Sequence, residues 1–286
     1  MRAVALHPDV IVVTSALLHV NCVIVRGGVE GERVQAGAVE GSHAGAAQHA
    51  GAIANAGETF VIDSPVLPDE LDALPALVDQ ARLPAPSGLL ATHGDWDHLL
   101  GRLAFPGLAL GCAETTAERL HAAPGEAQRE LRTFDEQLAI ERPHPLALGS
   151  VQALPVPGRC ELGDRELELH PTDGHTIDGM AIWIPWARVL VAGDYLSTVE
   201  LPVLNEPGGL DAYMETLARL RSLVPHAQYV VPGHGQVLDS ARARAVLDED
   251  LTYLGTLAKM GDKAELPPGR GGAVQRRLHR ENLLAL

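Results

Sequence analysis

The chain has 286 residues, of which 46% are hydrophobic and 21% are charged. This composition is typical of a globular protein and excludes a mainly disordered or fibrous chain. The formal net charge of −15 argues against a nucleic-acid partner, because phosphate backbones attract basic surfaces.

The cysteines and apolar runs predict a cytoplasmic protein without a membrane partner. Cys22, Cys112 and Cys160 are far apart and lack C-x-x-C spacing, which predicts neither a disulfide framework nor a thiolate zinc site. No signal peptide is recognisable at the N-terminus. The best apolar run, at residues 180–193, is interrupted by a proline and an arginine and is too short to cross a bilayer.

Short apolar runs that end in turn residues predict buried strands, and longer runs with three- and four-residue spacing predict helices. The expected strands lie at 10–13, 22–25, 60–62, 89–91, 181–184, 189–192 and 229–231, and the expected helices at 210–224 and 240–260. Strands and helices in this mixture indicate an α/β fold.

A third helix is expected around Leu71, Leu74 and Val78, which have helical spacing. Proline is tolerated in the first turn of a helix but disrupts its interior. We therefore expect this helix to begin near Asp72, so that Pro75 falls in the first turn.

Two segments differ from the rest of a chain that we expect to form a single domain over residues 1–286. Residues 27–58 hold eight glycines and nine alanines with no sustained apolar period, which predicts an insertion outside the core, either a surface loop or a flap. Residues 259–286 carry six basic residues against three acidic ones, and we expect these arginines and lysines to form a solvated face.

The first cluster of metal-capable side chains follows the predicted strand at 89–91. Side chains alternate in an extended segment, so His93, Asp95 and Asp97 are expected on one side, and His98 can turn beside them. Imidazole and carboxylate groups bind zinc, iron and manganese. This spacing predicts a metal site at the end of a strand.

Three later segments place a further candidate ligand after a strand or in a glycine turn. His175 lies in the segment Pro171–Thr176, and Asp194 and His234 follow the strands at 189–192 and 229–231. Each segment is a weak signal alone, because glycine turns with Asp or His are common. The four segments together strongly indicate one metal centre.

These motifs resemble the metallo-β-lactamase superfamily, whose signature is H-x-H-x-D-H followed by separate His, Asp and His segments. The resemblance extends over roughly residues 9–240 and includes glyoxalase II-like metallo-hydrolases. It implies a four-layer αββα sandwich with two divalent metal ions at one edge of the sheets. Carried over by position, the ligands would be His93, Asp95 and His175 for one metal, Asp97, His98 and His234 for the other, and Asp194 between them.

Asp95 departs from the signature, because most members carry histidine at this position. Zinc is the first metal expected from the resemblance. The additional carboxylate makes the site harder and more anionic, which favours iron or manganese relative to zinc. Since Asp is shorter than His, the alternative is that Asp95 lies outside the metal's direct contacts.

The resemblance implies a hydrolase that uses a metal-bound hydroxide to attack an acyl bond of a small substrate, such as an ester, thioester or lactone. Asp97 is the candidate catalytic residue, as a proton acceptor besides its role as a ligand. The alternative is a non-haem iron redox enzyme, either a diiron oxygen or nitric oxide reductase or a sulfur dioxygenase. A non-catalytic metal-binding module is disfavoured by the complete ligand set. The sequence does not predict an oligomeric state.

Overall fold

The computed structural model describes residues 1–28, 57–204 and 209–286. Its strands form two sheets. The seven-stranded sheet has the order β1 (Arg2–His7), β2 (Val10–Thr14), β3 (Asn21–Gly27), β4 (Glu58–Ile62), β5 (Gly88–Leu90), β6 (Leu110–Ala113) and β7 (Val151–Leu154). The six-stranded sheet has the order β13 (Leu238–Asp239), β12 (Tyr229–Val231), β11 (Val189–Val191), β10 (Met180–Ile184), β9 (Arg165–Pro171) and β8 (Gly158–Leu162).

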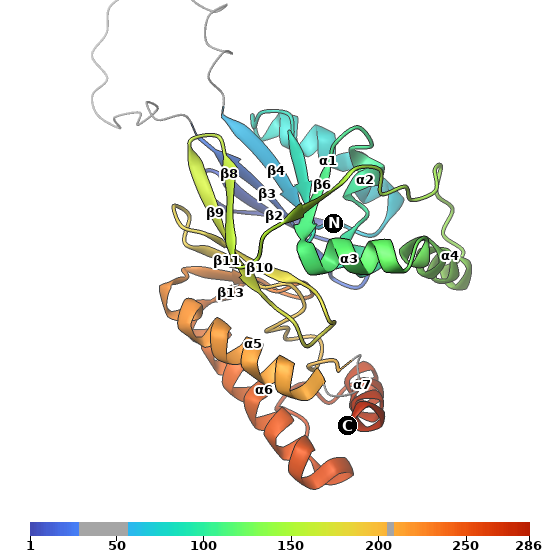
Figure 1. The fold of residues 1–286 in the computed structure, drawn as a ribbon, viewed down its shortest axis with the longest axis vertical. Coiled ribbons are helices and arrows are strands. Elements are labelled where there is room, and N and C mark those ends of the chain that lie inside the picture. The colour runs from blue at the N-terminus through green and yellow to red at the C-terminus, as the bar shows by residue number, and fades with distance from the viewer. Residues whose placement is uncertain (29–56, 205–208) are drawn as a thin grey trace, which may run out of the picture.

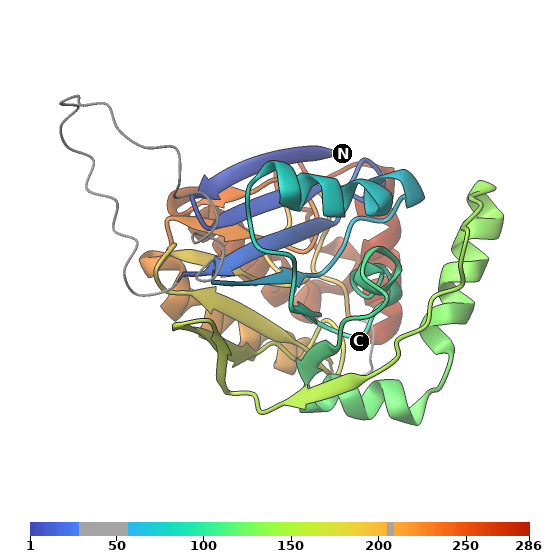
Figure 2. The ribbon, with the colours of Figure 1, turned by 90° about the horizontal axis from the view of Figure 1, so that it is seen from above.

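Helices cover the outer face of each sheet (Figures 1 and 2). They are α1 (Pro68–Gln80), α2 (Gly101–Ala104), α3 (Glu114–Ala122), α4 (Glu126–Leu138), α5 (Gly209–Leu223), α6 (Ser240–Met260) and α7 (Ala273–Ala285), with 3₁₀ turns η1 (Trp96–His98), η2 (Val224–His226) and η3 (Gly261–Lys263). In Figure 1, α5 and α6 lie on one side of the paired sheets, and α1 and α2 lie on the other. This arrangement is the four-layer αββα sandwich expected from the sequence.

Three apolar clusters fill the three spaces between these layers. The first joins α1, α3 and α4 to the larger sheet, the second lies between the sheets, and the third joins the smaller sheet to α5 and α6. Strand β2 contributes to two of these clusters, because Val12 faces the cluster between the sheets and Val13 faces the cluster under the helices. A strand with both faces buried requires a continuous apolar run, as in 10–13 and 22–25.

The seven predicted strands and the two predicted long helices are present, with ends that differ by one or two residues. Strands β1, β6 to β9 and β13 were not predicted. In β9 the apolar residues Leu167 and Leu169 alternate with Glu166 and Glu168, and only one face is buried. The predicted insertion at 27–58 lies almost entirely outside the described residues. Within the described part of the chain, no helix is long and apolar enough to span a membrane.

The predicted start of α1 is wrong. The helix begins after Leu67, with Pro68 at its first position and Asp69 and Glu70 in its first turn, so Pro75 lies in the helix interior. Pro68 suits the first position because its missing N–H would have no partner there. Pro75 lies on the exposed face of the helix, where its ring does not displace core side chains.

The prediction that the basic residues of 259–286 form a solvated face is wrong for Arg270. This side chain is 2% exposed, and it donates hydrogen bonds to the carboxylate of Asp250 (2.6 Å) and to Glu249 (3.1 Å). It also donates to the backbone carbonyls of Ser197 and Glu200 at 3.1 and 3.3 Å. The segment that follows α6 therefore anchors the loop after β11.

We expect Arg270→Met to lower the free energy of unfolding by about 3–5 kcal/mol, because it leaves the buried carboxylate of Asp250 without a cation. Chemical denaturation monitored by circular dichroism measures this change. The matched control is Arg277→Met, which removes an exposed arginine of α7 and should change stability by less than about 0.5 kcal/mol. Equal effects of the two substitutions would contradict the role assigned to Arg270.

Candidate metal centre

The candidate ligands meet at one edge of the sandwich because strand ends from both sheets lie there. In the larger sheet, β4 and β5 are parallel and lead to Asp63 and His93. In the smaller sheet, β11 and β12 are parallel and lead to Asp194 and His234. The sheets are joined at this edge, since the side-chain amide of Asn21 donates to the carbonyls of Pro232 (2.8 Å) and Gly235 (3.0 Å).

One group of donor atoms is formed by His93, Asp95 and His175, as the sequence predicted. The Oδ2 atom of Asp95 lies 3.5 Å from Nε2 of His93 and 3.4 Å from Nε2 of His175. The Oδ2 atom of Asp194 lies 3.7 and 3.3 Å from the same two nitrogens. Asp95 is therefore long enough to reach the cluster despite being shorter than histidine.

The second group is formed by Asp97, His98 and His234. The Oδ2 atom of Asp97 lies 3.5 Å from Nε2 of His234 and 4.0 Å from Nε2 of His98. Asp194 contacts this group too, with Oδ1 3.2 Å from His98 Nε2 and Oδ2 3.3 Å from His234 Nε2. The simple alternation expected for 93–97 ends at Asp95, because η1 turns Asp97 toward the second group. All seven predicted residues are thus brought together, with Asp194 between the two groups.

The donor set fits divalent metal ions. Two ligand atoms bound tetrahedrally at 2.0–2.1 Å from a zinc ion are about 3.4 Å apart, which is close to the distances above. The Nε2 atoms of His93, His98 and His175 are buried and have no hydrogen-bond partner among the residues that the structure describes. Buried polar atoms rarely remain unpaired without a reason, and a bound metal ion would satisfy these nitrogens.

The charges of the centre compensate one another strongly. Burial opposes ionisation of Asp194, but the facing histidines hold the pKa of its carboxyl well below the ordinary value. Burial alone would lower the pKa of His175 and His234. The facing carboxylates outweigh burial and raise each pKa to about 10. Asp194 acts on both histidines, Asp95 acts on His175 and Glu200 acts on His234. The same balance raises the pKa of His98 well above its usual range.

Backbone and side-chain contacts orient the histidine rings. Nδ1 of His98 lies 3.0 Å from Oδ2 of Asp63, and Nδ1 of His234 lies 2.9 Å from the carbonyl oxygen of Leu18. These contacts leave Nε2 of each ring directed toward the donor cluster. Asp63 has a φ of 56°, in the left-handed region, and its carboxylate also accepts hydrogen bonds from the backbone N–H and hydroxyl of Thr92. Gly233 is required by close packing, because a Cβ there would lie 1.9 Å from Oδ1 of Asp194.

Three residues near the centre were not among the predicted site residues. Asp63 directly follows a predicted strand, so its position at a strand end was a usable signal. Arg119 of α3 forms an ion pair with Asp95, and no sequence spacing indicates this contact. Glu200 offers a carboxylate oxygen within 4.8 Å of donor atoms of Asp194 and His234, and burial raises its pKa.

Comparison with known proteins identifies the family. The family model described as the metallo-beta-lactamase superfamily matches residues 45–234, and this range includes the seven donors. The chain belongs to the metallo-beta-lactamase superfamily. The resemblance inferred from the H-x-D-x-D-H motif is therefore confirmed at the level of the family. The predicted enzyme class, a metallo-hydrolase, agrees with this family.

Two relatives of this superfamily are similar to different shares of the chain. A hydroxyacylglutathione hydrolase from Ruegeria pomeroyi is 28% identical over 218 residues, which cover 74% of this chain and 71% of the relative. A type 2 metallo-beta-lactamase from Bacteroides fragilis is 33% identical over 64 residues, which cover 22% of this chain and 26% of the relative. The matched segments thus range from about a quarter to about seven tenths of these relatives' length.

Solved structures of superfamily members confirm the predicted fold. A metallo-beta-lactamase from Pontibacter korlensis is similar with a TM-score of 0.54 and 16% identity, over 86% of this chain and 97% of the other. A metallo-beta-lactamase family protein from Thermus thermophilus is similar with a TM-score of 0.61 and 20% identity, over 98% of this chain and 94% of the other.

We expect His175→Ala and His234→Ala each to lose one of two bound divalent ions, because each removes a donor from a different group. Elemental analysis after loading metal-free protein with zinc and removing excess metal measures the stoichiometry. His170→Ala is the control, since His170 in β9 pairs with Glu168 outside the cluster. Full stoichiometry in both ligand variants would disprove the assignment.

We expect zinc affinity to rise with pH between about 7 and 9, because metal-free His175 and His234 have pKa values near 10 and must lose protons to bind. Calorimetric titrations in buffers with different ionisation enthalpies give the number of protons released. A release of about three protons per protein is expected at pH 7.5, because the pKa of His98 is raised as well. An affinity independent of pH would show that these histidines are already neutral.

Proposed function

We propose that this protein is a metal-dependent hydrolase that cleaves an acyl bond of a small substrate, such as an ester, a thioester or a lactone. One observation carries the proposal. The donor cluster opens onto a cavity of about 780 Å³, and Asp95 and Asp97 form part of its lining. A substrate in this cavity would lie directly against the metal centre.

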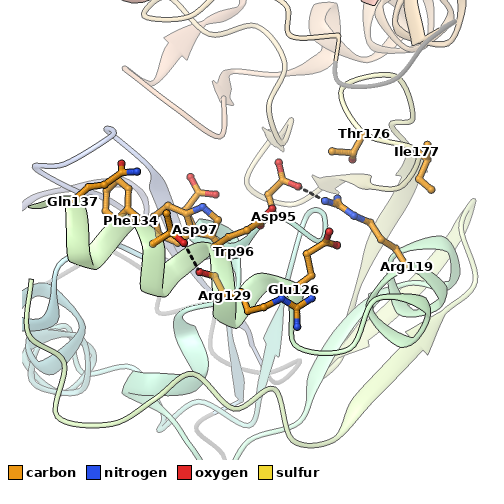
Figure 3. A pocket seen from close by; sticks show the side chains of 12 residues that line it. Asp95, Trp96, Asp97, Arg119, Glu126, Arg129, Phe134, Gln137, Thr176 and Ile177 are labelled. Atoms are coloured by element: carbon orange, nitrogen blue, oxygen red, sulfur yellow. Dashed lines mark hydrogen bonds and ion pairs between the residues drawn. The ribbon is translucent and has the colours of Figure 1, made fainter.

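The cavity combines an apolar surface with charged side chains (Figure 3). Trp96 and Phe134 pack with their ring centroids 4.5 Å apart and, with Ile177, offer apolar contacts to an acyl group. Arg129 also lines the cavity, together with Glu126, Glu130, Thr133, Gln137 and Thr176. A substrate with an apolar acyl group fits this lining.

The residues of the centre divide the chemical tasks. When bound, divalent ions supply Lewis acidity and lower the pKa of water at the site. His93, Asp95 and His175 would hold one ion, and Asp97, His98 and His234 the other, with Asp194 contacting both. Asp97 also lines the cavity, so its carboxylate is placed to accept a proton as well as to bind metal.

Glu200 is a second candidate for holding a proton. Its carboxylate is half-buried beside Asp194 and His234, and this burial raises its pKa. A carboxyl group with a raised pKa takes up and returns a proton at a higher pH than an ordinary glutamate does. The backbone of Glu200 is fixed by Ser197 and Arg270, which supports a defined position for this side chain.

The names of the relatives offer two substrate classes, hydroxyacyl thioesters and β-lactams. The cavity lining argues against strongly anionic substrates. Glu126 and Glu130 lie near Asp95, and burial and these neighbouring carboxylates raise the pKa of Glu130. We therefore place neutral esters, thioesters and lactones ahead of glutathione thioesters, which carry carboxylates.

Zinc is the first metal to test, with iron and manganese next because Asp95 adds a carboxylate to the donor set. The redox alternative gains no support from the relatives named above, which are hydrolases or metallo-beta-lactamases. Hydrolysis is therefore the function that we propose.

We expect zinc- or manganese-loaded protein to hydrolyse at least one neutral ester, thioester or lactone in a panel that also includes glutathione thioesters. Asp97→Asn should reduce kcat/KM by about 10²–10⁴-fold. Initial rates and metal content are measured on the same preparations, so that loss of metal and loss of proton transfer are distinguished.

The control for this experiment is Thr133→Ala, which changes the cavity lining without altering a metal donor. It should change kcat/KM by less than about tenfold. The proposed function is contradicted if the zinc-, manganese- and iron-loaded proteins all fail to hydrolyse every substrate in the panel.

A further inference from the structure

The environment of Asp95 differs from that of the other carboxylates in the centre. Its Oδ2 atom faces His93 and His175, whereas its Oδ1 atom accepts a hydrogen bond of 2.8 Å from Nη2 of Arg119. Figure 3 shows the two side chains pointing toward each other. One oxygen is therefore held by the protein, and the other remains free for a metal ion.

Arg119 is itself fixed by a second carboxylate. Its Nη1 atom donates to Oδ1 of Asp178 at 2.8 Å, and the side chain of Asp178 is fully buried. Oδ2 of Asp178 accepts from the backbone N–H of Gly94 (2.9 Å) and from the hydroxyl of Thr116 (2.8 Å). Asp178 thus connects α3 to the backbone residue that precedes Asp95.

We propose that Arg119, held by Asp178, is a positioning residue that makes Asp95 a metal ligand and compensates for the histidine that the superfamily signature carries at this position. Arg119 pairs with both Asp95 and Asp178, so its positive charge offsets part of the negative charge of Asp95. The substitution of Asp for His consequently adds less negative charge to the centre than the ligand count alone suggests.

The two effects of Arg119 on metal binding have opposite signs. Its positive charge repels a divalent ion, whereas its hydrogen bond holds the Asp95 carboxylate in the orientation that binding requires. The side chain of Asp95 is 25% exposed and lines the cavity, so without Arg119 it is free to rotate away from the two histidines. Partners that orient metal ligands typically contribute about 10–100-fold to affinity, and orientation therefore dominates.

The proposal makes the effect of Arg119 depend on Asp95. In the natural sequence, Arg119→Met removes the group that orients Asp95, and zinc affinity falls. In the Asp95→His variant, Arg119 no longer orients a carboxylate and acts only as a cation near the metal. There, Arg119→Met leaves zinc affinity unchanged or increases it.

The experiment compares four full-length proteins: the natural sequence, Arg119→Met, Asp95→His and the double variant. Metal-free protein is titrated with zinc in competition with a chromophoric chelator, which gives the affinity of each bound ion without a substrate. We expect Arg119→Met to weaken one ion by about 10–100-fold and the other by less than about threefold. In the Asp95→His background, we expect no loss.

Two further variants keep the test decisive. Arg129→Met removes another arginine of the cavity, one that donates to the carbonyl of Pro124, and should leave both affinities within about threefold. Arg119→Lys keeps the positive charge but lacks the planar fork that reaches two carboxylates, so it should still weaken one ion. It also replaces Arg119→Met if that variant does not fold.

The proposal is overturned if Arg119→Met weakens zinc equally in both backgrounds, since Arg119 would then support the fold and not Asp95. It is equally overturned if zinc affinity is unchanged in the natural background, or if lysine fully replaces arginine. The proposal rests on the ligand assignment made above but not on acyl hydrolysis. Because no substrate is used, its failure and the failure of the proposed reaction are separate results.

Discussion

The carboxylate of Asp194 is the contact on which the metal centre depends. Its two oxygens lie 3.2–3.7 Å from the Nε2 atoms of four histidines that come from three separate loops. Burying so many polar groups is unfavourable unless each has a partner of opposite character. The carboxylate offsets part of this cost before metal binds, and it keeps both donor groups within reach of two ions. Close approach at Gly233 and the left-handed backbone of Asp63 are the local conformational demands of this arrangement.

The function proposed here follows from where this buried centre meets solvent. Asp95 and Asp97 belong both to the donor cluster and to the cavity lining, so substrate and metal share one boundary. On one side of that boundary, histidine and aspartate charges are balanced by contacts within the protein. On the other side, aromatic and acidic side chains select which acyl groups can approach. The Asp178–Arg119–Asp95 arrangement lies at the boundary and links ligand geometry to the helix that covers the sheet.

The sequence predicts the parts of this structure that have a local signal. Strands such as 22–25 and 189–192 are continuous apolar runs because both of their faces are buried, and the donors follow strands in the order of the superfamily motif. The α1 start is wrong because proline is compatible with an exposed position inside a helix, which a local rule does not detect. Arg119, Asp178 and the burial of Arg270 depend on contacts between distant segments. Asp178 is 59 residues from Arg119, and Asp250 is 20 residues from Arg270, so no short motif contains either pair.

The order in which the chain is synthesised gives the Asn21 and His234 contacts a further meaning. The side-chain amide of Asn21 donates to the carbonyl of Gly235, 214 residues later in the chain. The ring of His234 is oriented by the carbonyl of Leu18, 216 residues earlier. The loop that carries Glu200 is anchored by groups 70 and 78 residues further along. Contacts of such long sequence separation form late, because the intervening chain must first be ordered. The donor cluster therefore assembles only after His234 has left the ribosome, and an ion held by all seven donors is acquired no earlier than that.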